Sequence, residues 1–367
     1  MINRTTIARG NALLQVSEFC HESGAKEYHL MIAPSVTGSF YEQLSAVNQT
    51  LADFRNDHDD MCPDFVRYFV SDASNQEQLV KDSASELNCP VSVIEQPLLS
   101  GRKVSAWVYL VKRDCPSEYR HIWHASMKGC GPDSSSQTDS IFRKYADSLA
   151  KEGSTIPENC IRTWLFVQNV DVNYSGVVKG RRDFFDEIGL TRDTHYIAST
   201  GIAGRTGESS SKVMMDAYAV DGLIPEQITY LKGSTHLNPT HEYGVTFERG
   251  TSVDYGDRRH VFISGTASID NRGEIVHPGD IGHQTLRMWE NVEVLLAEAE
   301  CNFDDVVHMI VYLRDIADYA RVSAMFEERF HAYPKIFVWA PVCRPGWLVE
   351  MECMAVRQIV NKEYKPF

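Results

Sequence analysis

The sequence predicts an α+β fold in which three β-α-β-α-β-β units form a pseudo-trimer within one chain. Its 367 residues, of which 43% are hydrophobic and 23% charged, have an ordinary globular balance and allow two or three domains. The same order of strands and amphipathic helices recurs three times. Each predicted sheet has helices on one face only, so other sheets must cover its second face. Two domains with a long N-terminal insertion are the alternative.

The first unit, residues 1–115, is the most degenerate of the three. Leu44, Val47 and Leu51 recur at spacings of three and four, which indicates an amphipathic helix. We expect, in order, a helix at 40–54, a strand at 64–72, a helix at 75–87 and strands at 90–97 and 104–111.

The second unit, residues 116–235, repeats this order with a strand ahead of the first helix. We expect a strand at 121–126, a helix at 137–153, a strand at 160–170, a helix at 174–189 and strands at 195–204 and 212–220. The stretch 162–169 resembles 67–72 of the first unit, as expected for equivalent strands.

The third unit, residues 236–367, has the clearest pattern. Trp289, Val292 and Leu296 line one face of a helix, and 306–315 is rich in the β-branched and aromatic residues typical of strands. We expect a strand at 260–268, a helix at 279–301, a strand at 306–315, a helix at 319–330 and strands at 336–342 and 347–356.

The charge balance argues against nucleic acid as the main partner. Lys and Arg number 36 against 50 Asp and Glu, a net charge of -14, and such a surface repels phosphate backbones. A pocket in an acidic protein can still be locally positive. The sequence has no apolar run of signal-peptide or membrane-spanning length. Its nine cysteines are scattered singly, so we expect a reduced cytoplasmic protein without a metal site. We also expect no membrane partner and no cofactor.

The last predicted strand carries two carboxylates on one face, Glu350 and Glu352, among apolar neighbours. If that face lies between units, burial raises the pKa of a carboxyl, which suits a general acid. The alternative is structural, with both acids on an exposed edge or paired with an arginine. Glu350 is the candidate acid, and Glu352 is assigned a structural role.

Several other residues are candidates for binding an anionic ligand. Arg162 and Arg344 are expected to be half-buried and therefore to need an anionic partner, whereas Arg181 and Arg182 are expected to be solvated on a helix. The glycine-rich stretch 199–207 forms either an anion-binding turn or a plain hairpin. Cys343 is interpreted as a pocket wall, because no histidine is placed to activate it.

The third unit resembles the RidA/YjgF family, which has a chorismate-mutase-like fold. The resemblance is carried by ISGTAS, GDIGHQT, the helix around Asn291, DDVVHMIVYLRDIADYARV and LVEMECMAV. Imine deaminases of this family carry a catalytic arginine after a proline that follows the second helix. Here Pro334 is followed by Lys335, and Ile336 occupies the arginine position. The old ribonuclease label of the family suits this acidic chain poorly.

The whole-chain pattern resembles the chorismatases, which derive from RidA. The matching stretches are RTW (162–164), GRRDFF (180–185), HYIASTGIAG (195–204), SGTAS (264–268) and CRPGWLVEME (343–352). The resemblance implies cleavage of the enolpyruvyl ether of chorismate to pyruvate and a dihydroxycyclohexadienoate or hydroxybenzoate, with Glu350 as the acid. The implied substrate-binding residues are Arg162, Tyr196, Thr200, Gly201, Arg205, Ala267, Cys343 and Arg344. A non-enzymatic protein that binds small carboxylates and an atypical imine deaminase remain alternatives, and we expect a monomer.

Overall fold

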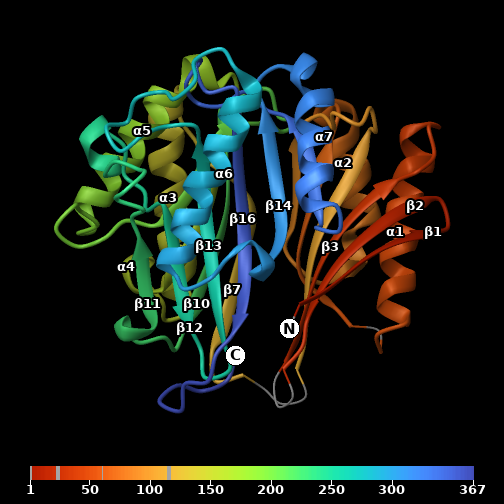
Figure 1. Cartoon of the computed structure of the whole chain (residues 1–367), viewed down its shortest axis with the longest axis horizontal. Helices are drawn as coiled ribbons and strands as arrows, with labels where there is room; N and C mark the ends of the chain where they lie inside the picture. The colour runs from red at the N-terminus through yellow and green to blue at the C-terminus, as the bar shows by residue number, and fades with distance from the viewer. Residues whose placement is uncertain (1, 22–24, 60, 114–116) are drawn as a thin grey trace.

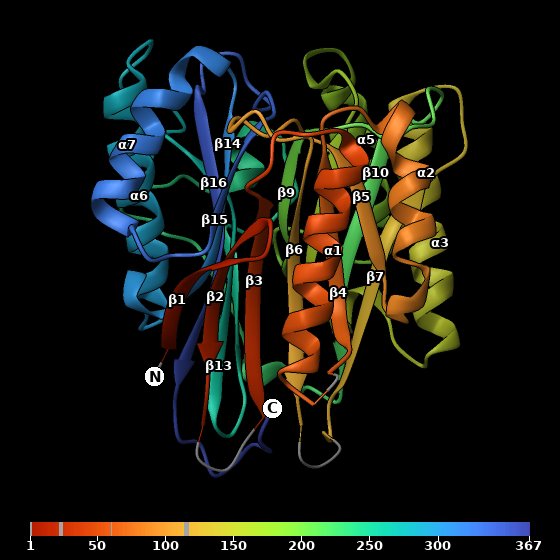
Figure 2. The same ribbon diagram turned by 90° about the vertical axis from the view of Figure 1, so that its right-hand side faces the viewer.

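Three β-sheets stand side by side with their helices on the outside (Figure 1). The computed structural model describes residues 2–21, 25–59, 61–113 and 117–367. Viewed from the side, the helices flank strands that run along the middle of the molecule (Figure 2). The α+β pseudo-trimer predicted from the sequence is confirmed.

The first sheet has six strands in the order β1-β2-β3-β6-β4-β5. Its elements are β1 (Ile2–Arg9), β2 (Ala12–Phe19), β3 (Lys26–Pro34), α1 (Phe40–Asn56), β4 (Pro63–Val70), α2 (Ala73–Ser83), β5 (Val91–Glu95) and β6 (Val104–Lys112). A capping box between Ser39 and Glu42 starts α1, whose residues Leu44, Val47 and Leu51 are buried. The sequence pattern did not locate β1, β2 or β3, the three strands that precede α1.

The second sheet has four strands in the order β7-β10-β8-β9 and follows the predicted unit order. Its elements are β7 (Arg120–Lys128), α3 (Ser134–Lys151), α4 (Ile156–Asn159), β8 (Cys160–Val167), α5 (Val170–Glu187), β9 (Ala198–Ala203) and β10 (Val213–Asp221).

The third sheet has six strands in the order β11-β12-β13-β16-β14-β15. Its elements are β11 (Ile228–Leu231), β12 (Gly250–Asp254), β13 (Arg258–Ala267), α6 (Ile281–Glu298), β14 (Val306–Leu313), α7 (Tyr319–Phe330), β15 (Lys335–Trp339) and β16 (Val349–Gln358). This sheet starts at Ile228, ahead of the unit boundary at 235/236 that the sequence suggested. Like the first sheet, it has two more strands than the predicted unit.

The strand register places three residues in corresponding positions on the inner faces of the sheets. Glu350 on β16 pairs with Tyr312 on β14, next to the end of the strand pair. Met214 on β10 pairs with Phe166 in the second sheet, and Ser105 on β6 pairs with Phe69 in the first. Because only the third sheet has an acid here, the three sheets are alike in fold but different in chemistry.

Two residues further along, the same strands make contacts between sheets. Asp216 on β10 accepts a hydrogen bond of 2.9 Å from Nε of Arg67 on β4, and both side chains are fully buried. Glu352 on β16 accepts one of 2.9 Å from Nη2 of Arg162 on β8. At the corresponding position of β6, the Trp107 ring lies 4.5 Å from the ring of His308 on β14. Two buried ion pairs and one aromatic contact therefore join the units around the axis.

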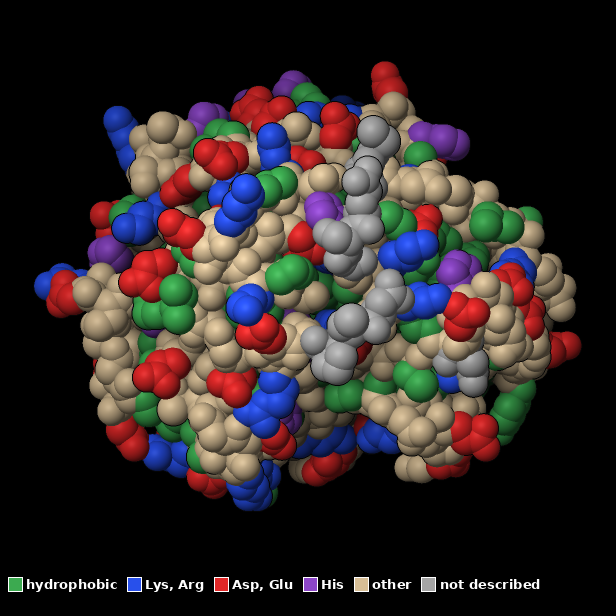
Figure 3. All heavy atoms as spheres, turned by 90° about the horizontal axis from the view of Figure 1, so that it is seen from below, with side chains coloured by type: hydrophobic (Ala, Val, Ile, Leu, Met, Phe, Trp, Pro, Cys, Tyr) green, Lys and Arg blue, Asp and Glu red, His purple; other side chains and the backbone are tan. Residues whose placement is uncertain are grey.

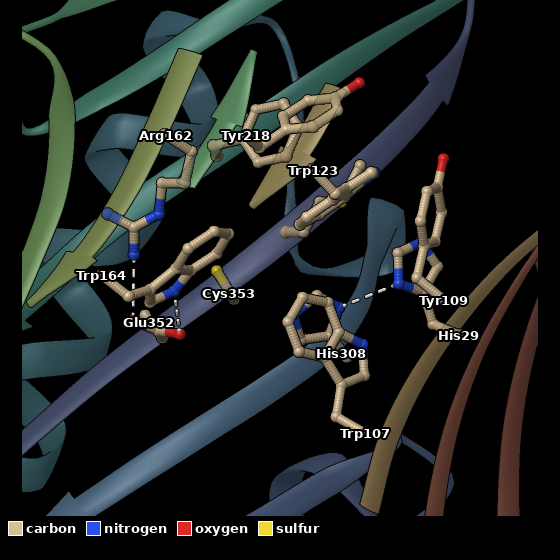
Figure 4. A pocket seen from close by; sticks show the side chains of 12 residues that line it. His29, Trp107, Tyr109, Trp123, Arg162, Trp164, Tyr218, His308, Glu352 and Cys353 are labelled. Carbon is tan, nitrogen blue, oxygen red and sulfur yellow. Dashed lines mark hydrogen bonds and ion pairs between the residues drawn. The ribbon is translucent and has the colours of Figure 1, made fainter. Parts of the chain in front are cut away.

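The centre of the molecule is closed by aromatic side chains (Figure 4). Trp107, Trp123 and Trp164 lie with their ring centroids 6.1 to 6.4 Å apart. Together with His29 and His308 they line a cavity with about 10 Å³ of free space, which is room for about one water molecule. The axis is therefore a packed core and not a substrate channel.

Candidate active site

The candidate active site is a pocket between the second and third sheets, around Glu350. It is lined by Tyr174, Arg181, Ser199, Gly201, Val245, Phe247, Arg249, Gly265, Ala267, Ile269, Cys343, Arg344, Trp347 and Glu350. Two isolated bridges bring the sheets together here, between Ala198 and Glu248 and between Ile202 and Val342. The pocket thus depends on contacts between segments that are far apart in the sequence.

Glu350 reaches the pocket because β16 is a central strand of the third sheet. It pairs with Ala267 on β13 and is only 4% exposed. Burial first and the negative charge of Glu352 second raise the pKa of this carboxyl to about 8, against the opposing effects of Arg162 and Arg249. Glu350 is therefore largely protonated at neutral pH, as a general acid must be.

Gly265 gives the Glu350 carboxyl the space it occupies. The register of β13 against β16 shifts between Ile263 and Thr266, which is the mark of a β-bulge. A Cβ added at Gly265 would lie 2.1 Å from Oε1 of Glu350, well inside contact distance. A side chain at this position would therefore displace the Glu350 carboxyl.

Glu352 does not enter this pocket. Its Oε2 accepts a hydrogen bond from Arg162, and its Oε1 accepts one of 2.8 Å from the indole Nε1–H of Trp164 (Figure 4). The side chains of Arg162 and Glu352 are 2% and 4% exposed. This guanidinium therefore neutralises a protein carboxylate at the axis, although the sequence suggested that it binds the substrate.

Three other arginines supply the positive charge of the pocket. Arg181 projects from α5 and donates to the hydroxyls of Thr246 (3.2 Å) and Ser199 (3.4 Å). Arg249 donates to the backbone and side-chain oxygens of Asn238, at 3.0 and 3.1 Å. Arg344 extends over the Trp347 ring, with its guanidinium carbon 5.5 Å from the centroid. The three guanidinium groups come from separate segments, which suits a ligand with more than one carboxylate.

Cys343 and Tyr174 form another wall of the pocket. Burial raises the pKa of the Cys343 thiol to about 12, against the lowering effect of its hydrogen bond with Tyr174. A thiol with so high a pKa is a poor nucleophile. The Tyr174 ring covers Gly201, where an added Cβ would lie 2.9 Å from Cε2 of the tyrosine. A larger residue at 201 would therefore displace the tyrosine.

The structure brings five of the nine sequence-predicted site residues to this pocket. These are Glu350, Gly201, Ala267, Cys343 and Arg344. Thr200 lies behind it, with its hydroxyl accepting from Arg162 and from the Gly265 backbone. Tyr196 lines a neighbouring surface pocket instead.

Arg205 is also outside the pocket. Its Nε donates to Oε1 of Glu95 at 2.6 Å, across the junction of the first and second sheets, and its side chain is 44% exposed. The carboxylate of Glu95 therefore occupies the position that the sequence assigned to a ligand.

Sequence reasoning missed Arg181, Arg249, Tyr174 and Trp347. Arg181 was expected to be solvated, but it is 2% exposed, whereas Arg182 is indeed exposed. A signal existed, because Arg181 continues the buried face of α5 between Val177 and Phe184. Arg249 stands outside any amphipathic pattern and could not have been found in this way.

The described residues contain no group of three or more His, Cys, Asp or Glu side chains arranged to hold a metal. In the same part of the chain, no helix has the length and apolar character needed to cross a membrane. Acidic and basic side chains are interspersed on the lower face of the molecule (Figure 3).

Comparison with known proteins places the third unit in a family. Residues 252–357 match the family described as Endoribonuclease L-PSP. A RutC family protein of Pyrococcus abyssi is 38% identical over 101 residues, which cover 27% of this chain and 79% of that protein. The 3-aminoacrylate deaminase RutC of Acinetobacter baylyi is 29% identical over 97 residues, 26% of this chain and 77% of the relative.

The similarity of fold to a solved structure extends over nearly the whole chain. A crystal structure of a chorismatase superposes with a TM-score of 0.65 and 18% identity, over 91% of this chain and 100% of the chorismatase. Sequence relatives thus identify the third unit, while the structural likeness extends over all three. The chain belongs to the RutC family of the RidA/YjgF superfamily and has a chorismatase-like fold.

Proposed function

We propose that this protein is a chorismatase-like enzyme that cleaves the enolpyruvyl ether of chorismate. The observation that carries the proposal is a buried Glu350 with a pKa of about 8, facing a pocket with three arginines between the second and third sheets. Cleavage of an enol ether needs a proton donor, and a dicarboxylate needs cations to bind it. The shared fold with a chorismatase supports this reading.

The reaction needs one acid and one water. Protonated Glu350 donates its proton to the methylene carbon of the enolpyruvyl group, which leaves an oxocarbenium carbon next to the ether oxygen. Water adds to that carbon, and the Glu350 carboxylate accepts a proton from it. The hemiketal then collapses to pyruvate and the ring alcohol, a dihydroxycyclohexadienoate. Loss of the ring C4 oxygen as water in the same site would give a hydroxybenzoate instead.

The arginines position the substrate and stabilise its charges. Arg181 and Arg249 are buried, so charge-assisted hydrogen bonds to substrate carboxylates are strong there. Arg344 lies at the exposed edge and suits capture of an incoming anion. This division gives the two carboxylates of chorismate separate partners.

Pyruvate release from chorismate tests the proposal. Purified protein should produce pyruvate, and Glu350→Gln should abolish the activity without unfolding the protein. Glu187→Gln is the matched control, since Glu187 is an exposed carboxylate on α5 paired with Arg143. Absence of pyruvate from the wild-type protein, or unchanged turnover in Glu350→Gln, would refute the assignment.

A non-enzymatic carboxylate-binding role is the second candidate, favoured by the cationic pocket itself. It predicts that chorismate raises the Tm while no product forms. Deaminase activity is disfavoured, because Ile336 at the position of the family arginine is apolar and 7% exposed. Enzyme-dependent formation of pyruvate and ammonia from 2-aminoacrylate would restore deaminase activity as a candidate.

A monomer is the oligomeric state that we propose. The inner faces of the three sheets cover one another within a single chain, so no second copy is needed to bury them. Light scattering during gel filtration should give the mass of one chain. A mass of two or three chains would refute this proposal.

A further inference from the structure

The hydroxyl of Thr200 holds together the parts of the molecule that surround Glu350. Thr200 is on β9 of the second sheet and is 1% exposed. Its Oγ1 accepts a hydrogen bond of 2.5 Å from Nη2 of Arg162 and one of 2.9 Å from the backbone N–H of Gly265. Both lone pairs of the oxygen are therefore used by the protein.

The Gly265 contact crosses from the second sheet to the third and ends on the β-bulge of β13. A bulge interrupts the strand ladder and leaves backbone groups without a strand partner, and Thr200 satisfies one of them. The Glu350 carboxyl lies against the same glycine. A Cβ added at Gly265 would be 2.1 Å from Oε1 of Glu350 and 3.0 Å from Cγ2 of Thr200. The acid and the threonine methyl therefore pack against one spot of backbone.

We infer that Thr200 is a positioning residue for Glu350, because its hydroxyl fixes the Gly265 bulge against which the acid rests. It does not bind the substrate, although the family resemblance suggested that it does, since it is absent from the pocket lining. The inference rests on the proposed role of Glu350 as the acid. Arg162, which bonds both Thr200 and Glu352, ties the bulge to the ion pair at the axis.

Loss of the hydroxyl should loosen the bulge. In Thr200→Val the Gly265 N–H loses its acceptor in a partly buried place, which the protein relieves by moving the bulge or admitting water. Either response exposes Glu350, so its pKa should fall towards the ordinary value of a glutamic acid. A displaced and partly ionised acid lowers kcat, whereas binding of the substrate by Arg181, Arg249 and Arg344 persists.

The first test separates kcat from KM in pyruvate release from chorismate. Thr200→Val should lower kcat by about 10- to 100-fold, with KM changed less than about twofold, and Thr200→Ser should restore most of the activity. Thr50→Val, which removes a buried hydroxyl from α1 in the first unit, is the control for a general loss of stability. A rise in KM at unchanged kcat would make Thr200 a substrate contact and overturn the inference, as would equal activities of the Val and Ser variants.

The second test needs no substrate. An infrared titration of the Glu350 carboxyl, assigned by its absence in Glu350→Gln, should give a lower pKa in Thr200→Val than in the wild type. The charged or titratable groups around Glu350 that must remain intact are Arg162, Tyr174, Arg181, Arg249, Tyr312, Cys343, Arg344 and Glu352. An unchanged pKa in Thr200→Val would overturn the inference even if chorismate proves not to be the substrate.

Gly265→Ala tests the same relationship from the other side, should Thr200→Val fail to fold. The added methyl group meets the carboxyl oxygen at 2.1 Å and must push it away. We expect the same signature, namely a lower kcat, an almost unchanged KM and a shifted pKa of Glu350. Wild-type kcat and a wild-type pKa in Gly265→Ala would show that the bulge does not position the acid.

Discussion

Arg162 and Glu352 join the second and third sheets through a buried ion pair in which Nη2 lies 2.9 Å from Oε2. Glu350, two residues away on the same face of β16, faces the pocket instead. The two carboxyls therefore have different surroundings, because Arg162 bonds Glu352 at the axis while Glu350 lines the pocket. Burial first and the nearby negative charge of Glu352 second raise the pKa of Glu350.

Removal of one member of this ion pair should destabilise the protein strongly. Arg162→Met leaves the buried Glu352 carboxylate without its cation, which costs about 3–5 kcal/mol of the free energy of unfolding. The double variant Arg162→Met with Glu352→Met should lose much less, because no charge remains buried. Urea unfolding of both variants and of Glu352→Met completes a double-mutant cycle. If the losses in the free energy of unfolding of the two single variants simply add up in the double variant, the pairing is contradicted.

Activity should fall as the pH rises through about 8. Glu350 acts in its protonated form, and its pKa is raised to about 8 by burial first and by Glu352 second. We expect kcat/KM for chorismate to be level below this pH and to drop tenfold per pH unit above it. A profile that instead rises through pH 8 would indicate a base and would exclude Glu350 as the acid.

Stability should depend on pH through the same carboxyl. In the unfolded chain Glu350 has an ordinary pKa near 4.5, whereas in the folded protein it is near 8. The folded state binds more protons between these values, so stability falls as the pH rises through this window. Glu350→Gln has no buried carboxyl to ionise. It should therefore be more stable than the wild type by up to a few kcal/mol above pH 8, and by little at pH 4. Equal pH dependence of the two free energies of unfolding would contradict the raised pKa.

Arg181 and Arg182 are a matched pair for testing whether the pocket arginines bind the substrate. Arg181 lines the pocket, whereas its neighbour is exposed on the other face of α5. Arg181→Ala should raise KM for chorismate about 10- to 100-fold, since a hydrogen bond to a charged group contributes about 1.5–3 kcal/mol. Arg182→Ala should leave KM unchanged. Equal effects of the two substitutions would remove Arg181 from the binding site.

Arg249 should act on binding in the same way, and its orientation depends on Asn238. Arg249→Ala should raise KM by a similar factor of about 10 to 100. Asn238→Ala removes one of the two oxygens that hold the guanidinium, at 3.1 Å, and leaves the backbone oxygen at 3.0 Å. A smaller rise in KM is therefore expected for Asn238→Ala. A larger effect of Asn238→Ala than of Arg249→Ala would contradict this order of roles.

The arginines show which side-chain positions can be predicted from local sequence patterns and which cannot. Arg181 could have been placed correctly, because it falls on the same helical face as Val177 and Phe184. Arg205 and Arg162 could not, since each is neutralised by an acid from another sheet, Glu95 and Glu352. Charge pairing over such separations leaves no periodic trace in the sequence.

The sequence by itself determined the order of the elements, the single helical face of each sheet and the presence of two carboxylates on one face of the last strand. Periodicities of two and 3.6 residues set these features, because they depend on the local backbone geometry alone. Only the tertiary structure decided that Arg162 pairs with Glu352, that Glu350 faces the arginine pocket, and that Ser105 and Met214 occupy its place in the other sheets. Those outcomes depend on the register between strands and on the packing between sheets, where residues nearly two hundred positions apart become neighbours.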